Sequence, residues 1–120
     1  MILADTNAWV THVRSSDARL VRLLGDNRVV ACDVVIGELL LGAGLPKSLA
    51  STLALLPRLP SPTTVETLLY IRRHQTVFRS SGVGWADAQI IIAGAESGAP
   101  VYSSDAAVRK VWRKLGFRLP

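Results

Sequence analysis

The sequence predicts an α/β fold in which helices cover both faces of a mostly parallel sheet. Three observations lead to this fold class. Short apolar or β-branched runs alternate along the chain with longer segments of helical periodicity, as in strand–helix–strand units. Glycines, prolines and helix-capping residues separate these segments. The chain has 120 residues, of which 49% are hydrophobic, so we expect one domain, residues 1–120, around one core.

The first predicted strand covers residues 2–4, and Asp5 follows at its carboxyl end. Thr6 and Asn7 are residues that favour helix N-caps, so we expect the first helix to begin there. A second helix is predicted for residues 17–24, where leucines recur at helical spacing.

A β-branched run over residues 28–32 predicts the second strand. We expect Asp33 to cap a helix that extends to about residue 43, and another helix to cover residues 47–56. Three prolines then interrupt a connection that has room for one short strand at residues 58–59.

Two helices are predicted in the following part of the chain. One extends from Thr63 or Thr64 to about residue 79. The other covers residues 85–98 and is apolar nearly all round, which predicts that it is buried. A flexible loop over residues 80–84 joins them.

The last predicted elements are a strand, a basic helix and an edge strand. The strand covers residues 101–102. Ser103 or Ser104 is expected to cap the helix, with Asp105 in its first turn. We expect the edge strand at residues 117–119.

The chain carries 14 basic and 9 acidic side chains, a formal net charge of +5. This balance suits a polyanionic partner such as RNA. Four basic residues on the last predicted helix are candidates for contacts with an RNA backbone: Arg109, Lys110, Arg113 and Lys114. A solvated helix face explains the same four residues equally well.

Cys32 is the only cysteine, so no internal disulfide is expected, and its apolar neighbours predict a small buried residue. No apolar stretch reaches the length of a membrane span, so no membrane association is expected. The first residues lack the basic region of a signal peptide. We therefore expect the protein in the cytoplasm.

Four acidic residues are predicted to meet at one edge of the sheet: Asp5, Glu38, Asp87 and Asp105. Ligands of open parallel sheets bind beyond the carboxyl ends of the strands, where two of these acids follow a strand directly or closely. Clustered carboxylates repel one another unless a cation neutralises them. Oxygen ligands without thiols or clustered histidines favour Mg²⁺ or Mn²⁺, ions that activate water for cleavage of phosphodiesters.

Each acid also has a structural explanation. Asp5 is able to cap the first helix, and Asp87 and Asp105 are able to complement helix dipoles. Glu38 is harder to explain in this way, because it lies in a very apolar helix where a lone carboxylate is costly.

Four segments in order resemble the motifs of PIN-domain nucleases, and in particular VapC-type toxins. They are ILADTNAWV, VVIGELLLG, WADAQIIIAG and VYSSDAAVRKVWRKLG, and they cover essentially the whole chain. The resemblance implies a three-layer α/β/α fold with a short-stranded, twisted, mostly parallel sheet. It implies a Mg²⁺- or Mn²⁺-dependent endoribonuclease toxin whose metal and catalytic positions match the four acids.

The resemblance also implies supporting residues and partners. Thr6, Asn7 and Ser103 match polar positions beside the acids, although helix capping explains them as well. Members of this family are usually homodimers and are inhibited by a cognate antitoxin protein. The helices between residues 47 and 79 are candidate contact surfaces; alternatively, their apolar faces complete the core.

Other functions remain open at this point. The sequence is also compatible with a PIN nuclease that is not a toxin, or with a catalytically weak PIN module that acts through a protein partner. The presence of all four acids argues against the weak module. A phosphoaspartate hydrolase needs a second aspartate two residues after the first, and that position is Asn7.

Overall fold

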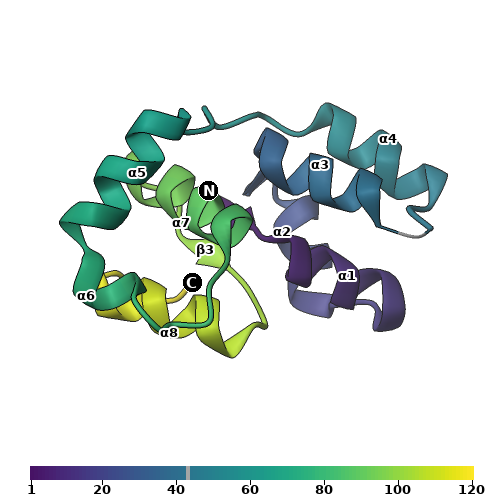
Figure 1. The fold of residues 1–120 in the computed structure, drawn as a ribbon. Helices are drawn as coiled ribbons and strands as arrows, with labels where there is room; N and C mark the ends of the chain where they lie inside the picture. The colour runs from purple at the N-terminus through teal and green to yellow at the C-terminus, as the bar shows by residue number, and fades with distance from the viewer. Residues whose placement is uncertain (43) are drawn as a thin grey trace.

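The computed structural model describes residues 1–42 and 44–120. Helices α1 to α4 gather on one side of the molecule and α5 to α8 on the other (Figure 1). The elements, in chain order, are β1 (Ile2–Ala4), α1 (Thr6–Ser15), α2 (Ala18–Gly25), β2 (Val29–Val30), α3 (Asp33–Leu41), α4 (Lys47–Leu55), α5 (Thr64–Arg73), α6 (Gln75–Phe78), α7 (Trp85–Ser97), β3 (Val101–Tyr102) and α8 (Ala106–Lys114).

The three strands form a parallel sheet in the order β2-β1-β3. The central strand β1 is buried along its whole length, and Leu3 pairs with Val30 on one side and Val101 on the other. The predicted α/β class with a parallel sheet is therefore confirmed. Since β1 and β3 run in the same direction, their carboxyl ends share one edge, where the Asp5 amide donates to the Tyr102 carbonyl at 3.0 Å.

Two predicted edge strands are absent from the described residues. Arg58 forms only an isolated parallel bridge with Ala31, so its segment borders β2 without forming a strand. The prediction of a strand at residues 117–119 is wrong. There the indole N–H of Trp112 donates to the Arg118 carbonyl at 2.8 Å and the Phe117 ring stacks on Trp112, so this segment is held by a side chain of α8.

The capping residues differ from those predicted. Asp5 caps α1 instead of Thr6 or Asn7, and Asp105 caps α8 instead of Ser103 or Ser104. Each aspartate has extended backbone geometry just before the first helical turn, which lets a carboxylate oxygen accept hydrogen bonds from amides of that turn.

Helix α3 begins at Asp33 itself, with Cys32 before it, so Asp33 is not the cap. Asp33 instead forms an ion pair with Arg58 at 2.6 Å. The helix ends at Leu41, and the predicted end near residue 43 falls outside the described residues. The long helix predicted up to residue 79 is broken at His74, whose backbone (φ −113°, ψ 36°) separates α5 from α6.

Helix α7 contacts both halves of the molecule, since it packs against α3, α5, α8 and β3. Its predicted burial is confirmed by Ile90, Ile91 and Ile92, which are almost fully buried. Gly94 permits the close approach to β3, because a Cβ there would lie 2.7 Å from the Ala99 carbonyl oxygen and from Val101 Cγ2. Within the described ranges, none of the helices combines the length and apolar character that a membrane crossing demands.

Candidate active site

Asp5 lies at the carboxyl end of the central strand and is almost completely buried, with 1% of its surface exposed. One carboxylate oxygen accepts a hydrogen bond from the Ala8 amide at 2.8 Å, which fixes the side chain at the start of α1. The pKa of Asp5 is raised to about 6, mainly by burial and to a smaller extent by the charges of Asp87 and Asp105. The Ser103 hydroxyl and the Ala8 amide act in the opposite direction.

Asp105 lies beyond the neighbouring strand β3 at the start of α8. Its carboxylate accepts from the amides of Ala107 at 2.8 Å and Val108 at 3.1 Å, while its own amide donates to the Ser103 hydroxyl at 3.0 Å. The turn that places Asp105 is thus fixed at both ends. Its charge reaches Asp5 and Asp87, since it raises the pKa of both.

The other two acids come from helices that face this edge. Asp87 occupies the first turn of α7, half-buried, and burial is the main cause of its raised pKa. The charges of Glu38 and Asp105 raise that pKa further. Glu38, on α3, is half-buried and accepts a hydrogen bond from the Thr6 hydroxyl at 2.5 Å.

The structure therefore brings the four predicted acids into one electrostatic neighbourhood. Asp87 is the link, because its pKa responds to both Glu38 and Asp105, and Asp105 also acts on Asp5. The ion pair between Arg58 and Asp33 is the only one within residues 1–42 and 44–120, so none of the four acids is neutralised by a basic side chain there.

The chemistry of this donor set fits a hard divalent cation. Buried carboxylates that raise each other's pKa are stabilised by an added positive charge, and oxygen donors are those that Mg²⁺ and Mn²⁺ prefer. In the described part of the chain, however, no three His, Cys, Asp or Glu side chains already stand close enough together to hold an ion. Metal binding at this edge would need the carboxylates to move closer together.

The predicted supporting residues lie beside the acids but act in different ways. Thr6 contacts Glu38 directly, and Ser103 lies between Asp5 and Asp105. Asn7 instead accepts a hydrogen bond from Ser104.

The sequence pattern predicts Ser104 only as a possible helix cap. It bonds to Asn7 and also lies 3.3 Å from the Thr11 hydroxyl, so it ties α1 to the segment after β3. No local pattern signals this role, because Ser104 lies nearly a hundred residues from each of its two partners in the sequence.

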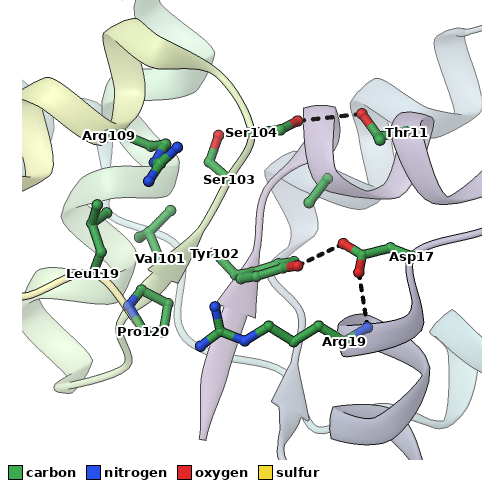
Figure 2. Close-up of a pocket in the computed structure, with 11 residues that line it drawn as sticks. Thr11, Asp17, Arg19, Val101, Tyr102, Ser103, Ser104, Arg109, Leu119 and Pro120 are labelled. Atoms are coloured by element: carbon green, nitrogen blue, oxygen red, sulfur yellow. Dashed lines mark hydrogen bonds between the residues drawn. The ribbon is translucent and has the colours of Figure 1, made fainter.

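The four basic candidates on α8 are all exposed. Arg109 differs from the others, because it lines a pocket together with Ser103 and Ser104 (Figure 2). The pockets described within residues 1–42 and 44–120 are not lined by Lys110, Arg113 or Lys114.

Comparisons with known proteins found matches that cover nearly the whole chain. The family model for the PIN domain matches residues 2–114. The chain is 35% identical over 121 residues to Ribonuclease VapC32 of Mycobacterium tuberculosis, in the strains CDC 1551 / Oshkosh and ATCC 25618 / H37Rv. The match covers 99% of this chain and 96% of each relative.

Proposed function

Because this chain belongs to the PIN-domain family, we propose that it is a Mg²⁺- or Mn²⁺-dependent endoribonuclease and the toxin of a toxin–antitoxin pair. The observation that carries the proposal is the group of four carboxylates without basic partners at the edge where β1 and β3 end. The similarity to a ribonuclease over nearly the full length of both chains supports the same activity.

Asp5, Asp87, Asp105 and Glu38 are the proposed ligands and catalytic residues. A divalent ion bound there supplies activation of water and stabilises the negative charge that develops on the phosphoryl group. Asp5 and Asp105 accept hydrogen bonds from amides at the start of the helices that they cap, which keeps both side chains at this edge of the sheet. Thr6 orients Glu38, and Ser103 fixes the turn that carries Asp105.

RNA is the proposed substrate, and the exposed basic side chains of α8 are proposed contacts for its backbone. A net charge of +5 around an acidic site suits a polyanion whose phosphates are attracted by the surface and cleaved at the metal site. The alternatives are a PIN nuclease that is not a toxin and a weakly catalytic module that acts through a protein partner.

We propose two protein partners, an antitoxin and a second copy of this chain. Part of the apolar surface of α4 and α5 does not complete the core, which supports a role in contacts. Leu55 is 85% exposed, and Val65, Leu68 and Leu69 are 65%, 50% and 52% exposed. The three residues of α5 have the spacing of one helix face, and exposed apolar residues grouped in this way are typical of protein interfaces.

The test measures cleavage of a labelled single-stranded RNA with Mg²⁺, with Mn²⁺ and with EDTA. We expect cleavage only with metal, and a loss of more than about 100-fold in Asp5→Asn, because several kcal/mol of transition-state stabilisation depend on the ion. Asp26→Asn makes the same chemical change on an exposed residue outside the site and is expected to retain activity.

Folding of Asp5→Asn is checked by denaturant unfolding in EDTA. Asparagine also caps helices well, and it removes a carboxylate that burial disfavours, so we expect the variant to be at least as stable as the wild type. Cleavage in EDTA, or unchanged cleavage by Asp5→Asn, would contradict the mechanism. RNA binding without any cleavage would favour the weakly catalytic module.

The toxin role is tested by expression in bacteria. We expect growth arrest from the wild type and not from Asp5→Asn, and relief when the small protein encoded beside this chain is co-expressed. Normal growth with active enzyme would favour a nuclease that is not a toxin.

A further inference from the structure

The polar pocket that contains Arg109 borders the acidic site at Ser103, the residue that follows β3. It has a volume of about 240 Å³ and is lined by residues of α1, β3 and α8, by the N-terminal end of α2, and by the last two residues of the chain (Figure 2). In this view Arg109 lies above Val101, and Arg19 lies below Tyr102.

The pocket has an excess of positive charge. Asp17 is its one acidic residue among those that line it, against the two arginines. That carboxylate is already engaged, because it accepts from the Tyr102 hydroxyl at 2.6 Å and from the amides of Arg19 and Leu20. Neither arginine forms an ion pair with any described residue, so both guanidinium groups are available to an anion.

The tyrosine ring and the hydroxyl groups make the pocket more specific for its ligand than an exposed basic surface would be. The Arg19 guanidinium carbon lies 5.4 Å from the centre of the Tyr102 ring, a cation–π contact that favours its position over the pocket. Ser103, Ser104 and Thr11 add hydroxyl groups to the lining, and Leu119 adds an apolar wall. Planar guanidinium groups with hydroxyls are suited to phosphate oxygens, and the apolar wall is suited to a sugar.

The connection to the acidic site is direct. Ser103 lines the pocket and also acts on the pKa of Asp5, and Arg109 lies one helical turn after Asp105. Because Ser103 belongs to both, a strand with one phosphate at the acids is expected to place an adjacent nucleotide at this pocket. The acids repel the phosphate of that nucleotide, and the two arginines offset the repulsion.

We propose that this pocket binds the phosphate and ribose of a nucleotide adjacent to the scissile bond of single-stranded RNA. Its volume lies below the range of about 300–1,000 Å³ that is typical of pockets for drug-sized ligands, which fits one sugar-phosphate unit. This assignment rests on the proposed ribonuclease function and adds a substrate-positioning site to it.

The test compares Arg19→Gln and Arg109→Gln by fluorescence anisotropy with a labelled single-stranded RNA in EDTA. We expect each variant to bind about three to ten times more weakly, and the slope of log K against log salt to become shallower by about 0.7 per lost phosphate contact. Arg22→Gln is the matched control. It removes the same charge from an exposed position on α2 that does not line this pocket, and it is expected to bind within twofold of the wild type.

A second arm locates the contact on the RNA. Neutral methylphosphonates replace single phosphates on either side of the cleavage position. We expect one flanking substitution to weaken binding to the wild type and to have little effect on Arg109→Gln, because that contact is already lost. Equal losses for all variants at every position would contradict a pocket-specific contact.

Other results would overturn the proposal in distinguishable ways. Unchanged RNA affinity in both pocket variants, or an equal loss in Arg22→Gln, removes the pocket from RNA binding. If the pocket variants retain RNA affinity but lose binding of a polyglutamate peptide, the pocket is assigned to an acidic protein instead. Cleavage of RNA by the wild type with Mn²⁺ tests the proposed function separately. If the wild type cleaves RNA and the pocket variants bind RNA normally, only this inference is refuted. If the wild type does not cleave RNA, the proposed activity is refuted.

Discussion

At the scale of single residues, the two explanations offered for the acids turn out to be compatible. Asp5 and Asp105 cap helices, which is the structural explanation, and they also lie in the group of four acids. A carboxylate has two oxygens with about four acceptor positions, so one hydrogen bond to an amide leaves capacity for another ligand. Capping a helix therefore does not exclude metal binding by the same carboxylate.

Asp17 caps α2 and accepts a hydrogen bond from the distant Tyr102, a partner that no local pattern predicts. The hydrogen bond from the Tyr102 hydroxyl is the largest cause of the lowered pKa of Asp17. A carboxylate whose pKa is lower in the folded state stabilises the fold above its unfolded pKa of 3.8, and this contribution is lost as the pH falls through the folded value.

We therefore expect Tyr102→Phe to lower the free energy of unfolding by about 1–2 kcal/mol at pH 7, with a smaller difference from the wild type below about pH 3. Urea unfolding at a series of pH values measures this. Tyr70→Phe is the control, because the Tyr70 side chain is half-buried but its hydroxyl makes no hydrogen bond to a described residue. A difference that grows as the pH falls would be inconsistent with the assigned bond.

At the scale of elements, α7 determines how closely the helices approach the sheet. Its contact with β3 depends on a position without a side chain, because a Cβ on Gly94 would overlap a backbone oxygen and a valine methyl group. The nearest atoms belong to the segment that leads into β3 and to β3 itself, so relief of the overlap would displace the strand that precedes Ser103 and Asp105.

We expect Gly94→Ala to lower the free energy of unfolding by about 1–3 kcal/mol and to reduce nuclease activity, since overpacking shifts the backbone. Gly37→Ala is the control in α3, where nothing lies within 4 Å of the added Cβ, and it is expected to raise stability by about 0.5–1 kcal/mol. Thermal and urea unfolding of the two variants measure both effects. Equal stability of Gly94→Ala and the wild type would mean that α7 and β3 do not pack this closely.

At the scale of the whole molecule, charge and apolar surface are unevenly distributed. The four acids lie within electrostatic reach of one another in a protein with a net charge of +5, and several apolar side chains stay outside the core. On α5, Val65, Leu68 and Leu69 have the spacing of one helix face, and all three are at least half exposed. Such a face is a candidate for the proposed contact between two copies.

We expect the wild type to be a dimer at micromolar concentration and Leu68→Lys to be largely monomeric, because a desolvated charge opposes burial of that face. Sedimentation velocity measures the mass of each. Gln75→Lys adds the same charge at an exposed position on α6 and is expected to remain dimeric. A monomeric wild type, or a dimeric Leu68→Lys variant, would assign this face to another partner such as the antitoxin.

The sequence by itself determined the fold class and most helices, and it predicted the four acids as a site. These follow from local patterns: apolar runs predict β1 and β3, periodicity predicts the helices, and the acids stand next to the predicted ends of elements. The resemblance to PIN-domain nucleases rests on the same local segments, and the match of the family model over residues 2–114 confirms it.

Only the tertiary structure decided which of these residues interact. The Thr6 hydroxyl reaches Glu38 across 32 positions, and Tyr102 reaches Asp17 across 85. The pocket that contains Arg19 and Arg109 is formed by segments from both ends of the chain. The last residues are held by a hydrogen bond from the Trp112 side chain and do not pair with the sheet. The physical reason is that local patterns fix the backbone conformation of each segment, whereas contacts between distant segments depend on how the helices pack around the sheet.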